Sequence, residues 1–234
     1  MKIVFSWDDG AREDLKLISM HEKHDLPAMF FVPTINREGR DVLTAAEIKS
    51  ADSSLISFGG HTQNHSFLTM VERKDLDEEI YKNQEYLSDI LGKKIEHFCL
   101  PGGKYNDEVL SVAYKYYKTV RTADTMNFKN PDVLIKPSFH LYPRGYKSLI
   151  GNAVRNKSKN ELLNLLLHPH REYFKTLKEL IDMEAGNEKA EVVFWGHSWE
   201  LEEFDLWNDL ENIMSFISNN YKESCISYNC LFDK

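Results

Sequence analysis

The sequence predicts an α/β fold in which a parallel sheet closes into a small barrel, in one domain that spans residues 1–234. Short apolar runs, rich in β-branched and aromatic residues, alternate with stretches whose apolar residues recur every three to four positions. The runs number about eight, as a small parallel barrel requires. We see no repeat, low-complexity tract or Pro/Gly/Ser-rich linker that would divide the chain.

The first half of the chain supplies four expected strands. Residues 2–7 read KIVFSW, 28–33 AMFFVP, 55–59 LISFG and 96–100 EHFCL. Each run is short and largely apolar, which is typical of a strand buried between two layers. Between them, residues 13–24 and 73–91 have the three- and four-residue apolar spacing of helices with one buried face.

The second half continues the alternation. Its expected strands are 119–122, 134–141, 191–195 and 225–231, and its expected helices are 107–117, 160–183 and 206–219. In the longest of these helices we interpret the leucines at 162, 163 and 165–167 as a buried face. His168 and His170, on or beside this helix, are interpreted as structural.

Composition and charge exclude several classes of protein. The 37 acidic and 29 basic residues give a net charge of −8, and no dense basic run is present, so we do not expect nucleic acid as a partner. No run approaches the ~20 apolar residues of a membrane span. Three cysteines do not make a disulfide framework, and two carboxylates interrupt the first ten residues before a signal-peptide core is complete. We therefore expect a cytoplasmic protein without a transmembrane segment.

A pair of carboxylates ends the first expected strand, in the segment Trp7-Asp8-Asp9-Gly10. Adjacent carboxylates at a buried strand end repel one another and lose hydration, so a cation is expected beside them, and a metal ion is the usual one. The alternative is that Asp9 caps the following helix while Gly10 forms the turn.

Two histidines four residues apart follow the strand at 55–59, in the segment His61-Thr62-Gln63-Asn64-His65. This spacing puts both imidazoles on one side of a helical turn. The carboxyl ends of parallel strands open on one face, so Asp9 can join the two histidines there. The set of Asp9, His61 and His65 predicts a divalent metal ion with an open position, most favourably Zn²⁺, with Co²⁺, Ni²⁺, Mn²⁺ or Fe²⁺ as alternatives.

Two further strand ends carry polar residues. The segment Pro101-Gly102-Gly103-Lys104-Tyr105 lacks the spacing of a nucleotide-binding phosphate loop. A Pro-Gly-Gly turn leaves backbone N–H groups open, which suits an oxyanion site. The alternative is a plain turn. His197 follows the strand at 191–195 between Gly196 and bulky indoles, where it is placed to donate a proton.

These motifs resemble those of the polysaccharide deacetylase family of the NodB-homology type. The resemblance rests on Trp7-Asp8-Asp9-Gly10, on His61 to His65, on Phe98 to Gly103 and on His197, and it covers nearly the whole chain. It implies a distorted (β/α) barrel of about seven or eight strands. It also implies a metal-dependent hydrolase acting on carbon–nitrogen bonds other than peptide bonds, commonly one that removes an acetyl group from an N-acetylated amino sugar.

The resemblance also implies roles for individual residues. Asp8 corresponds to the general base and His197 to the general acid, Asp9, His61 and His65 to the metal ligands, and Gly102 to part of the oxyanion site. Cys99 stands where the family usually carries an arginine that orients the base. We expect Arg121, at another strand end, to supply this missing cation, and Asp124 to replace the acid that tunes the catalytic histidine.

The expected substrate is a carbohydrate bearing an N-acetylated amino sugar, as an intracellular precursor that is lipid- or nucleotide-linked. Alternatives are a non-sugar amide, an acetyl ester, or a non-catalytic carbohydrate-binding role. The cleft is expected around Arg121, His140 and Arg144. The expected oxyanion and substrate-binding residues are Gly102, Pro101, Arg121, Tyr105 and Trp199, and Trp7 and Trp195 are expected either to stack on a sugar or to pack the barrel mouth.

Overall fold

The computed structural model describes residues 1–130, 132–168 and 172–232. Its strands form one eight-stranded sheet in the order β6-β5-β4-β3-β2-β1-β8-β7, and every neighbouring pair is parallel. The strands are β1 (Lys2–Asp8), β2 (Ala28–Val32), β3 (Ile56–Gly60), β4 (His97–Cys99), β5 (Thr119–Arg121), β6 (Leu134–Ile135), β7 (Phe139–His140) and β8 (Glu191–His197).

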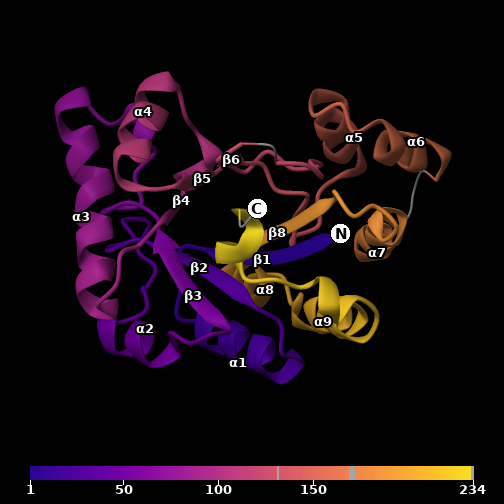
Figure 1. Ribbon diagram of the computed structural model, residues 1–234, viewed down its shortest axis with the longest axis horizontal. Coiled ribbons are helices and arrows are strands. Elements are labelled where there is room, and N and C mark those ends of the chain that lie inside the picture. Colours follow the sequence, from indigo (N-terminus) through magenta and orange to yellow (C-terminus); the bar gives the residue numbers. More distant parts are fainter. Residues whose placement is uncertain (131, 169–171, 233–234) are drawn as a thin grey trace.

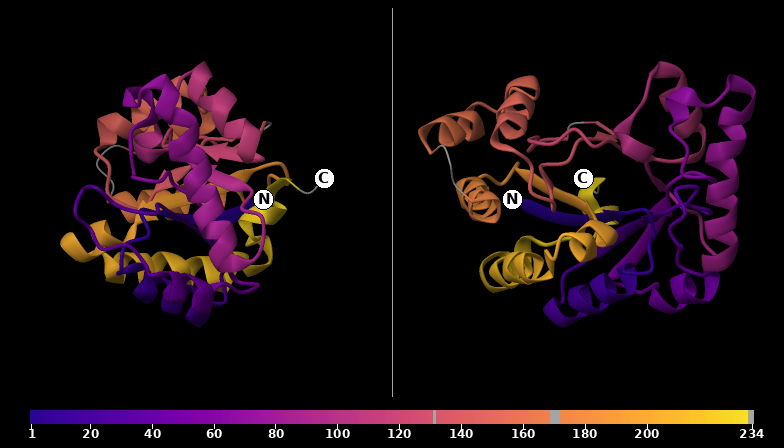
Figure 2. Two further views of the ribbon diagram at one scale, coloured as in Figure 1. Left: turned by 90° about the vertical axis from the view of Figure 1, so that its left-hand side faces the viewer. Right: turned by 180° about the vertical axis from the view of Figure 1, so that it is seen from behind.

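Helices surround the curved sheet on its outer side (Figures 1 and 2). No helix in the described ranges is long and apolar enough to cross a membrane. The helices are α1 (Asp14–His24), α2 (Ala45–Ala51), α3 (Arg73–Leu91), α4 (Asp107–Tyr116), α5 (Tyr146–Arg155), α6 (Lys159–Leu167), α7 (Tyr173–Glu184), α8 (Ser198–Glu203) and α9 (Trp207–Tyr221).

The sheet is an open, distorted barrel. Its end strands, β6 and β7, are two residues each and lie at opposite ends of the strand order, so the sheet does not close on itself. The run at 134–141 was expected to be one strand, but Pro137 lies between β6 and β7, and proline lacks the N–H that a central strand donates. The expected distorted (β/α) barrel is confirmed, and the expected closure is wrong.

The C-terminal segment is not the strand expected at 225–231. It forms two short 3₁₀ turns, Lys222–Ser224 and Tyr228–Phe232, and contributes one isolated bridge, between Ile3 and Cys225. Tyr228 and Leu231 are buried with Val4 and Phe31 in a small apolar cluster. The segment therefore fills the inner side of the curved sheet, which a closed barrel would fill with strand side chains.

Alternation along β1 separates the core from the site. Ile3, Phe5 and Trp7 belong to the large apolar core, whereas Val4 belongs to the inner cluster. Side chains of a strand alternate between its two faces, so Asp8 lies on the same inner side as Val4. The first strand thus brings the carboxylate of Asp8 to the inner side of the sheet.

The helix expected at 160–183 is two helices, α6 and α7. Leu165 is 1% exposed, but Leu163, Leu166 and Leu167 are each more than half exposed, so the expectation of one buried leucine face is wrong. Consecutive leucines run all the way round a helix, and α6 turns only one side toward the core. His168 follows α6 on the surface, and His170 lies outside the described residues.

Candidate active site

The carboxyl ends of the strands meet on one face of the sheet. Asp8 at the end of β1 is the register partner of His197 at the end of β8, and β3 ends at Gly60, directly before His61. A cavity of about 370 Å³ opens there. Both catalytic candidates and all three predicted metal ligands line it: Asp8, Asp9, His61, His65 and His197.

The turn after β1 is specified by its sequence. Gly10 has φ +60°, and a Cβ atom there would lie 2.6 Å from Cγ1 of Val32, so glycine is required on both counts. Asp9 itself adopts φ 75°, a conformation that non-glycine residues adopt rarely and chiefly at functional sites.

The three predicted metal ligands converge. Nε2 of His61 lies 3.3 Å and Nε2 of His65 3.0 Å from Oδ1 of Asp9, a buried atom with no hydrogen-bond partner. Nδ1 of His61 lies 2.8 Å from the carbonyl oxygen of Cys99, which fixes its proton there and leaves Nε2 as the free lone pair. Trp199 donates from Nε1 to Oδ2 of Asp9, at 2.8 Å. The donor set fits a divalent ion that prefers imidazole and carboxylate ligands.

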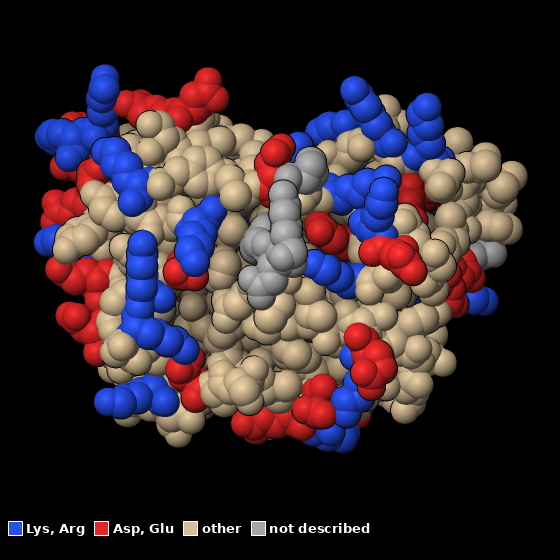
Figure 3. Space-filling model, in the orientation of Figure 1, with Lys and Arg blue, Asp and Glu red and all other residues tan. Residues whose placement is uncertain are grey.

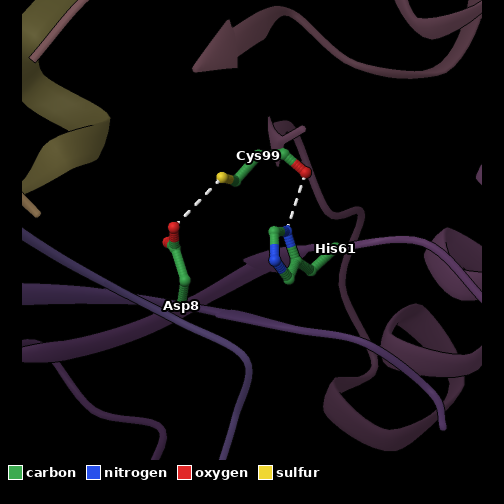
Figure 4. Close-up of side chains that lie close together, drawn as sticks. All are labelled: Asp8, His61 and Cys99. Atoms are coloured by element: carbon green, nitrogen blue, oxygen red, sulfur yellow. Dashed lines mark hydrogen bonds between the residues drawn. The ribbon is translucent and has the colours of Figure 1, made fainter. Parts of the chain in front are cut away.

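Asp8 is held by a cation from a different strand. Nη2 of Arg121, which is fully buried, donates to Oδ1 of Asp8, and the thiol of Cys99 lies 3.5 Å from Oδ2 (Figure 4 shows Asp8 with Cys99 and His61). Burial, the largest single cause, would raise the pKa of Asp8. The charges of Arg121, His61 and His197, together with the hydrogen bond from Arg121, outweigh it, and the pKa is lowered. Asp8 therefore remains ionised.

Arg121 therefore lies beside Asp8, where the missing cation was expected. It is not among the described residues that line the cavity, and its side chain is completely buried, so this geometry does not support the expectation that it binds substrate. Its register partner across β4 and β5 is Cys99. Burial raises the pKa of the Cys99 thiol well above its ordinary value, so this residue is a neutral neighbour and a poor metal ligand.

His197 is held by Glu200, three residues further on. Nδ1 of His197 lies 2.7 Å from Oε2 of Glu200. Burial lowers the pKa of an imidazole, but Glu200, helped by the charge of Asp9, outweighs this and raises the pKa of His197 to about 9. The expected tuning acid, Asp124, instead lies 3.6 Å from Arg155. The acid beside His197 thus comes from the same stretch of sequence. The three-residue spacing of His197 and Glu200, which brings side chains together in a helical turn, was the signal that could have indicated it.

The remaining predicted residues fall into two groups. Gly102, Trp195 and Trp199 line the cavity. Pro101 and Tyr105 are not among the described residues that line it, and Tyr105 packs against the core. Trp7 is completely buried, donating from Nε1 to Nε2 of His21 at 2.8 Å, which leaves it no surface for a sugar.

Several cavity residues were not predicted. Phe67 is 43% exposed on the cavity wall, and a Cβ at Gly102, where φ is +59°, would lie 2.6 Å from its ring, so Gly102 and Phe67 form one closely packed edge. Loop and helix positions that close a cavity have no motif of their own in a single sequence. The other unpredicted lining residues outside the sequence motifs are Glu38, Ala123, Thr125, Ser148 and Asn152.

The fold and this site are those of the polysaccharide deacetylase family. The family model described as "Polysaccharide deacetylase" matches residues 1–120, just over half of the chain, and the chain belongs to this family. Among curated proteins, it is 24% identical over 169 residues to the uncharacterized protein YlxY of Bacillus subtilis (strain 168), covering 71% of this chain. The chain spans 47% of that relative's length.

Solved structures share the fold. A family 4 carbohydrate esterase from Streptomyces lividans, in complex with acetate, has a TM-score of 0.59 at 14% identity, covering 97% of this chain and 91% of its own. The Streptococcus pyogenes deacetylase PplD, also in complex with acetate, has a TM-score of 0.52 at 24% identity. The match covers 58% of this chain and 62% of PplD. A family 4 carbohydrate esterase pseudoenzyme from Bacillus anthracis has a TM-score of 0.54 at 13% identity. The match covers 94% of this chain and 62% of the pseudoenzyme. At these identities the likeness establishes the fold, and activity must be argued from the site.

Proposed function

We propose that the protein is a metal-dependent hydrolase that removes an N-acetyl group, or another acyl group, from an amino sugar. The observation that carries the proposal is the convergence of His61 Nε2 and His65 Nε2 on an otherwise unpartnered oxygen of Asp9. Asp8 and His197, on neighbouring strand ends, flank this ligand set. When bound, the ion would supply a Lewis acid and make water acidic enough to act as a nucleophile near neutral pH.

The chain's own residues divide the proton transfers. Asp8, kept ionised by Arg121, accepts a proton from the attacking water. His197, kept protonated by Glu200, donates a proton to the departing amine. The two groups have opposite charge at neutral pH, which is what a base and an acid working in the same reaction require. Gly102 lies on the same cavity wall, where its backbone N–H is proposed to stabilise the oxyanion.

The cavity supports a sugar-sized substrate. A volume of about 370 Å³ lies at the lower end of the range of small-molecule sites. Phe67, Trp195 and Trp199 line it, and aromatic rings of this kind pack against the apolar face of a sugar ring. We extend the proposal to zinc as the resident ion, by ligand type, and to an intracellular glycan precursor, because the three cysteines are all free, as in a reducing compartment.

Release of acetate tests the proposal. The zinc-loaded protein is expected to release acetate from N-acetylglucosamine oligomers, to lose this activity in a strong chelator and to regain it with zinc. Asp8→Asn is the matched inactive control, since it keeps the shape of the side chain and removes the base. Acetate release that is unaffected by chelator, or that is equal in Asp8→Asn, would contradict the proposal.

Two alternatives have distinct outcomes in the same assay. An acetyl-ester deacylase would release acetate from acetylated xylan and leave the N-acetylated oligomers intact. A binding protein would bind the oligomers without releasing acetate. The pseudoenzyme among the structural relatives shows that a protein of this fold can lack activity. Against this, the present chain has the proposed ligands, the proposed base and the proposed acid around one cavity.

A further inference from the structure

One wall of the cavity carries an arginine that the catalytic roles do not use. Arg144 lies just before α5 and lines the cavity together with Ser148 and Asn152 of that helix. It is the one lysine or arginine among the lining residues in the described part of the chain. Over the face seen in Figure 3, lysine and arginine are interspersed with acidic residues.

Arg144 is held in place by buried neighbours. Its Nε–H donates to Nδ1 of His140, at 2.9 Å. His140 is 1% exposed, stacks on Trp195 with 3.9 Å between ring centroids, and directs Nε2 to Oε2 of Glu200, 2.8 Å away. With Nδ1 accepting, the proton of His140 resides on Nε2, so this imidazole is neutral and does not repel the guanidinium.

The two terminal nitrogens of Arg144 remain available to a ligand. No carboxylate pairs with Arg144 within the described ranges, whereas the acidic lining residues are engaged: Asp8 by Arg121, Asp9 by the two histidine ligands, and Glu38 by Nδ1 of His65 at 3.5 Å. A guanidinium has five N–H donors in a planar fork that matches the oxygens of a carboxylate or phosphate. A fixed fork with free donors in a cavity is suited to recognising such an oxyanion.

We propose that Arg144 selects the substrate by binding an anionic group, a carboxylate or a phosphate, on the acylated sugar itself. The inference rests on the proposed function, because it places the sugar in the same cavity. It narrows the substrate class to amino sugars that carry a negative charge, such as a sugar phosphate or an acidic sugar. Ser148, in the first turn of α5 on the same wall, is proposed as a further donor to that group.

Calorimetric binding to the zinc-loaded Asp8→Asn protein, which is expected not to turn substrate over, tests the proposal directly. The probes are N-acetylglucosamine, N-acetylglucosamine 1-phosphate and N-acetylmuramic acid. At least one anionic probe is expected to bind about 10- to 100-fold more tightly than the neutral sugar, the range of charge-assisted hydrogen bonds. Adding Arg144→Gln is expected to abolish this preference while changing the affinity for N-acetylglucosamine less than about threefold.

Lys147→Gln is the matched control, because Lys147 is exposed in the first turn of α5, outside the lining residues, and its loss changes the net charge equally. It is expected to leave the preference intact. The two anionic probes distinguish a phosphate from a carboxylate. Equal affinity for all three probes would overturn the inference. So would a preference for the anionic probes that remains in Arg144→Gln, because the zinc ion and not Arg144 would then bind the anion.

Acetate release by the parent protein from the same probes separates this inference from the proposed function. Binding that depends on Arg144, without acetate release from any N-acetylated substrate, would leave the anion site standing and refute the hydrolase. Acetate release without a preference for anionic probes would support the hydrolase and refute the anion site.

Discussion

Arg121, at the end of β5, donates a hydrogen bond to Asp8, at the end of β1, and both side chains are buried. The register partner of Arg121 is Cys99 of β4, whose thiol also contacts Asp8. Paired positions on neighbouring parallel strands direct their side chains to the same face. The positive charge beside the proposed base therefore comes from β5, one strand away from Cys99, the position at which the resemblance led us to expect an arginine.

This pairing predicts that an arginine at position 99 can replace Arg121 as the positive charge beside Asp8. Arg121→Met is expected to lower kcat by about 10²- to 10⁴-fold, because Asp8 loses the charge that keeps it ionised. The double variant Cys99→Arg/Arg121→Cys is expected to recover activity to within about tenfold of the parent. Steady-state kinetics measure this, with thermal unfolding to confirm that each variant is folded. A fully active Arg121→Met would refute the role of Arg121.

Glu200 is expected to act on the reaction through His197. Glu200→Gln removes the charge that chiefly raises the pKa of His197 to about 9. A general acid works in its protonated form, so activity falls as pH rises through its pKa, and a lower pKa moves this fall to lower pH. The pH profile of kcat/KM should show its alkaline limb shifted downward, with kcat reduced about 10- to 100-fold.

Glu202→Gln is the matched control for this substitution. Glu202 lies two residues away in α8 and accepts a hydrogen bond from Trp207 instead of contacting the site. Its variant should keep the parent profile. An alkaline limb that stays in place in Glu200→Gln would show that Glu200 does not act through His197.

Metal content should follow the two ligand histidines. His61→Ala and His65→Ala each leave two protein ligands, which rarely hold zinc tightly, so both variants are expected to lose most of their metal on desalting. Elemental analysis of the purified proteins measures this. His168→Ala, on the surface after α6, serves as the control and should retain the parent content. Unchanged metal in both ligand variants would refute the assignment.

Buried histidines outside the site are expected to make the fold sensitive to acid. His21 is completely buried between Trp7 and the Leu26 carbonyl, and burial lowers its pKa to about 4, against about 6.5 in the unfolded chain. Between these pH values the unfolded state binds more protons. The free energy of unfolding therefore falls as pH falls, by up to about 1.4 kcal/mol per pH unit from this residue.

His21→Gln should remove that contribution, since glutamine can both accept from Trp7 and donate to Leu26 without titrating. Urea unfolding between pH 4 and 7, with chelator present for both proteins, measures the difference. Curves of stability against pH that run parallel for parent and variant would contradict it.

The candidate metal ligands, base and acid could all be picked out from the sequence because each lies within a few residues of a strand end. Parallel strands bring such positions to one face whatever the details of the sheet. Asp9, His61 and His197 therefore meet as expected, although two of the eight expected strands were misassigned.

The features that sequence reasoning missed depend on three-dimensional packing. The split at Pro137 was readable from the proline alone, whereas the inward course of 225–231 depends on how Tyr228 fits against Phe31. Likewise, apolar spacing in α6 could not show which of its leucines would face the core, because nearly every position is apolar. Propensity in such segments is overridden by tertiary contacts.

The cavity is assembled from stretches of the chain that are separate in sequence. All three candidate metal ligands lie within the first 65 residues, whereas Arg144, Ser148 and Asn152 come from the connection between β7 and β8. If the proposed roles hold, the residues that bind the metal and the residues that select the substrate lie in different parts of the chain. Grafting residues 141–168 from a relative is therefore a direct route to a new specificity, since the ligands that hold the metal would be left untouched.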